Sequence, residues 1–277
     1  MKKLGILVAI LLMQSAIAQT NRFVYQVTMK PDASNKSDIK TENAYLDISA
    51  EKSMFYSENR IKRDSVISVN RQSGGARGFN RDQMESLRSS INYSIEKDKK
   101  NQKTIYKDRL GRDAYSYEED RALEWKILPE TTKIGEYKVQ KAETEFGGRK
   151  WTAWFTTDLP YQDGPYTFSG LPGLVVKVED ADGDYSFDLM KNYKIADFPE
   201  MNQFGNVVKV KRTDYVKQQE KFKTDPMSFM NSQRGGGISP PMRAGSGGSQ
   251  NPADMRKRME ERVKEEAKKN SNPIELK

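Results

Sequence analysis

Apolar and polar side chains alternate along most of the chain between residues 22 and 210. In the run 23–29, Phe23, Tyr25 and Val27 fall on one face of an extended strand, and the residues between them fall on the other. Eleven or twelve such segments joined by short turns predict an antiparallel meander. The further segments are 44–48, 53–56, 91–96, 104–107, 114–117, 123–127, 137–144, 150–157, 174–179, 184–190 and 207–210.

Two glycine-containing turns support this interpretation. The pair Gly147-Gly148 separates two of the segments, and Asp182-Gly183 separates two others. Both dipeptides favour tight β-hairpins. A sheet of this size must protect its edges, so we expect it to curl into a barrel or a half-barrel. The predicted fold is mainly β: a curved antiparallel meander sheet with short helices.

Helical patterns are few and lie outside the main sheet. A short helix is predicted at 81–88, after a glycine-rich loop at 72–80, and another at 215–222. Residues 231–250 are rich in Gly, Ser and Pro, which predicts a flexible linker. The last part of the chain, 251–277, is predicted to form a charged helix followed by a tail.

The first 18 residues have the three parts of a secretory signal. Lys2 and Lys3 precede an unbroken apolar run at 4–13, and small residues place a cleavage site after Ala18. The uncharged stretch 4–18 is shorter than the roughly 20 apolar residues that a bilayer core requires. We therefore expect an exported protein, periplasmic or associated with the outer envelope. Its predicted parts are a signal peptide (1–18), a β-rich domain (19–230), a linker (231–250) and a charged helix with a tail (251–277).

Composition narrows the chemistry that the chain can perform. None of the 277 residues is His or Cys, so histidine-based triads, zinc hydrolysis and thiol redox chemistry are excluded. An exported chain without disulfides depends on core packing, and the 13 Tyr and 11 Phe predict a core built from rings. The net charge of +8 is evenly mixed along the chain, which argues against nucleic-acid binding.

Carboxylate acid/base chemistry, a Ser/Lys pair and a hard-cation site remain open. Asp158 and Asp163 bracket a proline turn, and a pair of carboxylates can hydrolyse a glycoside; turn hydrogen bonding is the plainer interpretation. Residues 179–184 (EDADGD) suggest a cation loop. However, Tyr185 and Lys191 stand where a calcium loop of the helix-loop-helix kind needs Gly and Glu. We expect a solvated hairpin tip there, with no metal and no cofactor.

The stretch 164–174 combines backbone-shaping residues with apolar ones. Pro172 and Gly173 suit the central positions of a type II turn, and Gly170 permits close backbone approach. The stretch has neither the lysine nor the helix of a phosphate-binding loop. We therefore expect it to steer the strand at 174–179 and not to hold a ligand. The residues of this structural motif are Gly164, Pro165, Gly170, Leu171, Pro172, Gly173 and Leu174.

Several blocks of sequence resemble the signature of the GLPGLI family. They are 151–156 (WTAWFT), 158–160 (DLP), 164–168 (GPYTF) and 170–175 (GLPGLV), with the strand 133–142, the turn 146–149 and the chain end 272–276 (NPIEL) as further matches. The resemblance implies an exported protein of a Gram-negative envelope, often associated with TonB-dependent outer-membrane receptor systems, without an established enzyme activity. It supplies no catalytic residues.

Three hypotheses of different classes follow. The first is a non-enzymatic periplasmic binding or accessory protein, whose curved sheet holds an apolar ligand or a partner's peptide on a ring-lined face. The second is a hydrolase that uses Asp158 and Asp163, and the third is an assembly factor whose basic tail contacts a membrane or a partner. Since Trp151 and Trp154 lie at odd spacing on a strand, at most one of them can line a cavity; core filling is the alternative. The candidate binding residues are Trp151, Trp154, Tyr161, Tyr166 and Phe168.

Overall fold

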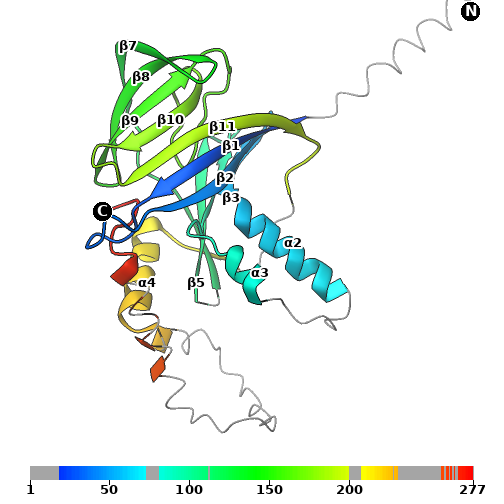
Figure 1. The fold of residues 1–277 in the computed structure, drawn as a ribbon, viewed down its shortest axis with the longest axis vertical. Helices are drawn as coiled ribbons and strands as arrows, with labels where there is room; N and C mark the ends of the chain where they lie inside the picture. The colour runs from blue at the N-terminus through cyan, green and yellow to red at the C-terminus, as the bar shows by residue number, and fades with distance from the viewer. Residues whose placement is uncertain are drawn as a thin grey trace, which may run out of the picture.

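A computed structural model of the chain contains one twelve-stranded sheet, with β12 at one end and β7 at the other (Figure 1). The structure describes residues 19–72, 81–111, 113–199, 207–226, 228–229, 257–258, 260–261, 263, 265 and 268–276. The predicted signal peptide (1–18), the linker (231–250) and most of the loop at 72–80 lie outside these residues. The strands are β1 (Thr20–Met29), β2 (Lys40–Ile48), β3 (Lys52–Ser57), β4 (Ser94–Asp98), β5 (Lys103–Leu110), β6 (Asp113–Glu118), β7 (Lys126–Ile134), β8 (Tyr137–Phe146), β9 (Arg149–Thr156), β10 (Leu174–Asp180), β11 (Tyr185–Ile195) and β12 (Val207–Lys209).

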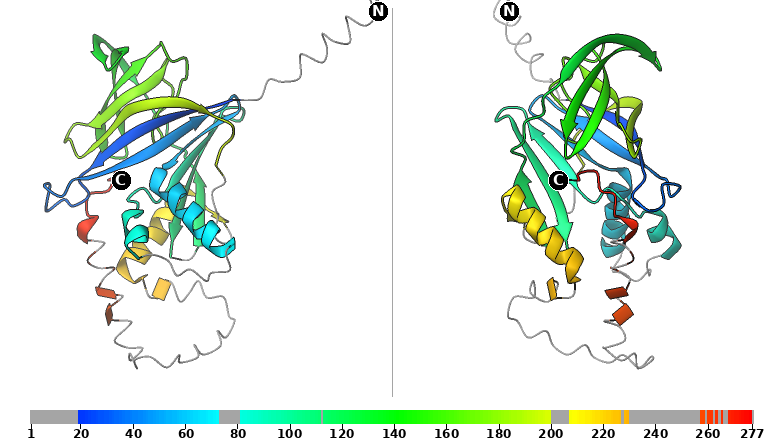
Figure 2. Two further views of the ribbon diagram at one scale, coloured as in Figure 1. Left: turned by 45° about the vertical axis from the view of Figure 1, so that its right-hand side comes forward. Right: turned by 90° about the vertical axis from the view of Figure 1, so that its left-hand side faces the viewer.

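Two antiparallel meanders make up the sheet. One contains β1 to β6 and the other contains β7 to β11, and the long pairing of β1 with β11 joins them. The two views of Figure 2 show that the sheet is strongly bent, with the β7–β10 part turned away from the β4–β6 part. Among the described strands, β12 and β7 end the sheet, so the curved meander is open. The short β12 departs from the antiparallel prediction, because it pairs with β6 in parallel.

One face of the sheet, which we call the inner face, carries the main core. Alternate residues of β1, among them Phe23, Tyr25 and Val27, belong to this core, whereas Val24 packs in a separate cluster. The segment between β9 and β10 adds Tyr166 and Phe168 to the same core, where both rings are buried. The stretch 164–174, which the sequence predicts to steer a strand, therefore also covers the inner face of the sheet.

The opposite face carries a smaller cluster beside α2 (Glu58–Gln72). Tyr56 is fully buried there, and Ile61 of α2 packs against the cluster. Arg22 reaches across the strands and donates to Asp47 over 2.7 Å, and its guanidinium lies 4.2 Å from the centre of the Tyr45 ring. Apolar positions in α2 are too few and too irregular to predict a helix, and no element is predicted from the sequence for residues 58–71.

The other helices were predicted. The pattern at 81–88 corresponds to α3 (Arg81–Ser86), and 215–222 corresponds to α4 (Arg212–Thr224). In Figure 2, α4 lies along the β5–β6 end of the sheet. Its Tyr215 is buried and donates to Asp108 of β5 over 2.6 Å. No helix among the described residues combines the length and the apolar character that a membrane crossing requires.

In the 164–174 stretch, Gly164 and Gly173 allow other backbone to pass close by, but the predicted type II turn is wrong, and so is the predicted close approach at Gly170. Gly173 has φ +157° and donates to Leu171 over 2.8 Å, while the amide of Leu174 bonds to Leu159 instead of closing the turn. A Cβ on Gly164 would lie 2.6 Å from the carbonyl oxygen of Phe168. These positions therefore need glycine because other backbone passes close by.

A pair of alanine substitutions tests this explanation. A Cβ on Gly173 would lie 2.0 Å from the carbonyl oxygen of Thr156, so Gly173→Ala should lower the free energy of unfolding by about 2–3 kcal/mol. Gly170 has φ +91°, but a Cβ added to it would have no neighbouring atom within 4 Å, so Gly170→Ala should cost only about 1 kcal/mol. Urea unfolding of both variants measures the difference. Equal losses would contradict the close approach.

Candidate functional site

The two carboxylates of the hydrolase hypothesis, Asp158 and Asp163, have different surroundings. Asp158 is exposed at the surface, whereas Asp163 is 3% exposed. The Asp163 carboxylate accepts a hydrogen bond of 2.7 Å from Lys97 Nζ and one of 2.8 Å from the amide of Gly164. Lys97 is buried as well, and it also donates to the carbonyl of Gly164 over 2.8 Å. Asp163 thus anchors the segment between β9 and β10 to β4.

The five candidate binding rings divide into two groups. Trp151, Tyr166 and Phe168 are at most 2% exposed and pack together, with 4.8 Å between the ring centres of Trp151 and Phe168. Trp154 and Tyr161 are half-buried, and Tyr161 contacts the edge of the Phe23 ring at 5.3 Å between centres. The first group therefore fills the core, and only the second group presents ring surface to solvent.

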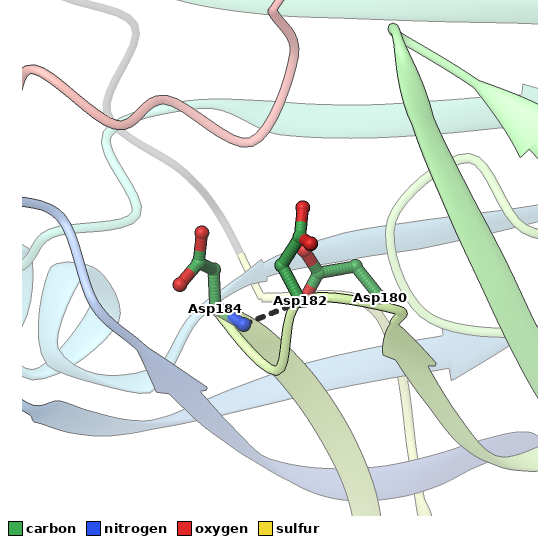
Figure 3. A group of neighbouring side chains, drawn as sticks. All are labelled: Asp180, Asp182 and Asp184. Atoms are coloured by element: carbon green, nitrogen blue, oxygen red, sulfur yellow. Dashed lines mark hydrogen bonds between the residues drawn. The ribbon is translucent and has the colours of Figure 1, made fainter. Parts of the chain in front are cut away.

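Three aspartates gather at the turn between β10 and β11 (Figure 3). Ligand oxygens of Asp180, Asp182 and Asp184 lie within 4.8 Å of one another. Asp180 Oδ1 accepts the amides of Asp184 and Tyr185, both at 2.7 Å, which fixes the turn. Its Oδ2 accepts a bond of 2.7 Å from the buried Arg149. Both oxygens of the Asp180 carboxylate are therefore occupied by hydrogen bonds from the chain itself, and the Arg149 guanidinium balances its negative charge.

The C-terminal end of the chain returns to this turn. In Figure 1 the red C-terminal segment lies beside the loop that follows β1. The carboxamide of Asn272 accepts a bond of 2.5 Å from Arg149 Nη2 and donates to the carbonyl of Lys30 and to Asp184, both at 2.8 Å. Asn272 is 6% exposed. Hydrogen bonds from its carboxamide to these three partners hold Asn272 in place.

Main-chain hydrogen bonds hold the residues on either side of this anchor. The Asn272 amide donates to Pro31 over 2.8 Å, and the Asn272 carbonyl accepts from the Tyr185 hydroxyl over 2.7 Å. Arg149 donates to the carbonyls of Pro273 over 2.8 Å and Ile274 over 3.1 Å. The next main-chain bond, 2.6 Å long, runs from the amide of Leu276 to Gly147. Residues 272–276 are therefore bound much as a separate peptide would be.

Glu275 provides a second side-chain anchor. Its carboxylate accepts hydrogen bonds from the Tyr166 hydroxyl and, over 2.8 Å, from Arg121 Nη2. Arg121 is held in turn by Glu119 and lies 4.3 Å above the Phe146 ring. Burial raises the pKa of Tyr166 well above its usual value, so its hydroxyl stays protonated and remains a donor.

We call residues 271–276 the tail and the surface beneath it the tail-docking site. The site combines the loop after β1, the turns after β8 and β10 with the strand residues beside them, Tyr166 of the segment between β9 and β10, and Arg121 of the segment between β6 and β7. Burial also raises the pKa of Tyr185 to about 12, which keeps this second hydroxyl as a donor. The side chains and carbonyls that contact the tail belong to Lys30, Pro31, Arg121, Gly147, Arg149, Tyr166, Asp184 and Tyr185.

Two buried cations have no role that was predicted from the sequence: Lys97, which holds the segment between β9 and β10, and Arg149, which holds the turn after β10. Lys97 follows Ile95 at a spacing of two on β4, and Arg149 precedes Trp151 at the same spacing on β9, so both cations point to the core face. A charged residue in the inward phase of a strand is the signal that could have revealed them.

Acid should weaken the docked state through Asp184. Burial alone would raise the pKa of Asp184, but hydrogen bonds from Lys36, Asn272 and Arg149 outweigh it and leave the pKa below its ordinary value. A lowered folded-state pKa stabilises the fold above the ordinary carboxyl pKa of about 4, and this contribution disappears as the pH falls through the lowered value.

Urea unfolding of the Asp184→Asn variant tests this prediction. At pH 7 the variant should have a clearly lower free energy of unfolding than the unaltered chain, and the difference should shrink at pH 3. A matched control is Asp182→Asn, at an exposed position, which should stay within about 0.5 kcal/mol of the unaltered chain at both pH values. A difference for Asp184→Asn that grows at pH 3 would contradict the role given to Asp184.

Residues 143–177 match a family model described as a protein of unknown function, Porph_ging. The matched residues run from β8 to β10, and they include Arg149 and the 164–174 stretch. This description is coarser than the GLPGLI resemblance, which stays a prediction. No curated protein sequence matches the chain.

Solved structures show likeness of fold. Two structures of PNGF-II, in space groups P21 and C2, match with TM-scores of 0.52 and 0.51 at 20% identity. The matches cover 72% of this chain but 33% and 32% of those chains, so the chain spans about a third of the length of these two structures. An outer membrane lipoprotein-sorting protein domain from Vibrio parahaemolyticus matches at 8% identity over 71% of this chain and 94% of that one, with a TM-score of 0.25. At these identities the PNGF-II match supports the fold alone, and the last match carries no argument.

Proposed function

We propose that the chain is an exported, non-enzymatic accessory protein of the GLPGLI type, which holds a peptide segment of a cell-envelope partner at the tail-docking site. The observation that carries this proposal is the way residues 272–276 are bound. Two side chains, Asn272 and Glu275, occupy fitted polar positions, and main-chain bonds hold the backbone around them. Peptide-binding domains commonly recognise their ligands with this combination.

A peptide is favoured over an apolar ligand by the placement of the rings. Trp151, Tyr166 and Phe168 pack against one another in the core, so they serve the fold. In contrast, the polar atoms of Arg149 and Arg121 point at the tail. A receptor of the TonB-dependent kind is the partner class that the family resemblance suggests.

Peptide binding to the full-length mature chain tests the proposal. The variant Asn272→Ala/Glu275→Ala removes both side-chain anchors of the tail, so its docking site should become accessible. A fluorescent peptide with the sequence of residues 269–276 (KNSNPIEL) should bind this variant saturably, as measured by fluorescence anisotropy. Binding to the unaltered chain should be much weaker, because its own tail competes at an effective concentration of about millimolar.

Two results would count against the proposal. If the peptide binds neither chain while circular dichroism shows both to be folded, the tail is a permanent part of the fold and the site accepts no other segment. If the peptide binds both chains equally, it binds elsewhere on the surface. A scrambled peptide of the same composition controls for charge-driven association.

A further inference from the structure

We infer that the tail-docking site is specific for a segment of the form Asn-Pro-apolar-Glu, and that the partner presents such a segment. This inference rests on the proposed function, because it names the chemistry of the peptide that the same site would take. The site contacts four consecutive residues of the tail, 272–275, in four different ways, and each contact disfavours particular side chains at its position.

The first position requires a carboxamide. Asn272 must accept from Arg149 at its oxygen and donate from its nitrogen to the Lys30 carbonyl and to Asp184. A carboxylate of the same shape has no donor for these two oxygens, and it would add a negative charge beside Asp184. An aspartate in this position is therefore rejected by chemistry and not by size.

The second position suits proline. No amide donor of Pro273 is needed, because its carbonyl makes the contact, accepting from Arg149 over 2.8 Å. Proline also restricts the residue before it to extended conformations, which lowers the entropy that Asn272 loses on binding. The ring itself is exposed, so the selection at this position is for backbone shape.

The third and fourth positions combine apolar and acidic selection. Ile274 is half-buried and packs against the main core, so a charged side chain there would be desolvated without a partner. One oxygen of the Glu275 carboxylate accepts from the Tyr166 hydroxyl, and the other forms an ion pair with Arg121, which Glu119 also holds. A neutral glutamine of the same length has one acceptor oxygen for these two donors and loses the ion pair with Arg121.

Selection ends after the glutamate. Leu276 contributes its amide to Gly147, and its side chain is 50% exposed. A substitution that keeps the amide should have little effect there. Position 276 therefore provides a matched control inside the same peptide.

Separate titrations with variant peptides test the specificity. The full-length Asn272→Ala/Glu275→Ala chain is titrated with the KNSNPIEL peptide and with three variants that carry Asn272→Asp, Glu275→Gln or Leu276→Ala. The aspartate and glutamine peptides should bind about tenfold or more weakly, as expected for the loss of hydrogen bonds to charged groups. The alanine peptide should bind within about threefold of the unaltered peptide.

The outcomes separate this inference from the proposed function. Equal binding of all four peptides would overturn the specificity and leave peptide binding intact, whereas no binding of any peptide would overturn both. If the double variant does not fold, hydrogen exchange at the Leu276 amide answers the same question in the intact chain. Asn272→Asp and Glu275→Gln should speed that exchange about tenfold or more, and Leu276→Ala should not; equal rates in all three would overturn the inference.

Discussion

Replacing Lys97 with Met is expected to lower the free energy of unfolding by about 3–5 kcal/mol, because it leaves the buried carboxylate of Asp163 without its cation. Lys97 Nζ lies 2.7 Å from Asp163 Oδ1, and the two side chains are 9% and 4% exposed. The same ammonium group holds the carbonyl of Gly164. Urea unfolding at pH 7 measures the loss.

Two variants control for the change of side chain. Lys99→Met removes an exposed cation two residues further along, and should stay within about 0.5 kcal/mol of the unaltered chain. Lys97→Met/Asp163→Leu removes both charges and should recover much of the loss, because a pair of apolar side chains can replace a buried ion pair. A loss of less than about 1 kcal/mol for Lys97→Met alone would show that Asp163 finds another partner.

Arg149→Met should have an effect of similar size and should also release the tail. It removes the cation of Asp180 and the donors to Asn272, Pro273 and Ile274 in one step. We expect a loss of about 3–5 kcal/mol by urea unfolding and faster hydrogen exchange at the Leu276 amide.

The neighbouring Lys150 provides the control for this prediction. Its side chain is 77% exposed and makes one long contact of 3.9 Å to Glu145. Lys150→Met should therefore change stability by no more than about 0.5 kcal/mol and leave the exchange of Leu276 unaltered. Unchanged exchange in Arg149→Met would show that Arg149 stabilises the turn without holding the tail.

The strands were predictable because local chemistry determines them. Alternation marked 150–157 where β9 runs Arg149–Thr156, and the glycines at 147, 148 and 183 adopt the positive φ that their hairpin turns require. The segment 123–127 was less accurate. β7 runs Lys126–Ile134, and Pro129 lies within its register shift, so the alternation that identifies a strand is interrupted there.

The candidate site was not predictable because its parts are distant in sequence. Asn272 lies 123 residues from Arg149 and 242 residues from Lys30, and no local pattern brings them together. From the sequence, residues 272–276 carry only a family resemblance. The acidic turn at 179–184 is predicted to be a solvated hairpin tip, and this prediction is wrong for two of its aspartates. In the structure Asp180 and Asp184 are buried, because Arg149 and the tail cover that turn. Long-range pairing of charged groups depends on the fold and cannot be deduced from spacing.

Disulfide trapping tests most directly whether the tail is docked. The chain has no cysteine, and Ser271 Oγ lies 3.0 Å from the amide nitrogen of Ala33, with both residues exposed. In the Ala33→Cys/Ser271→Cys chain, mild oxidation should form an intramolecular disulfide in nearly every molecule, detected as a monomer with faster migration on a non-reducing gel. Molecules that keep both thiols free, or that form only covalent dimers, would contradict the docked tail.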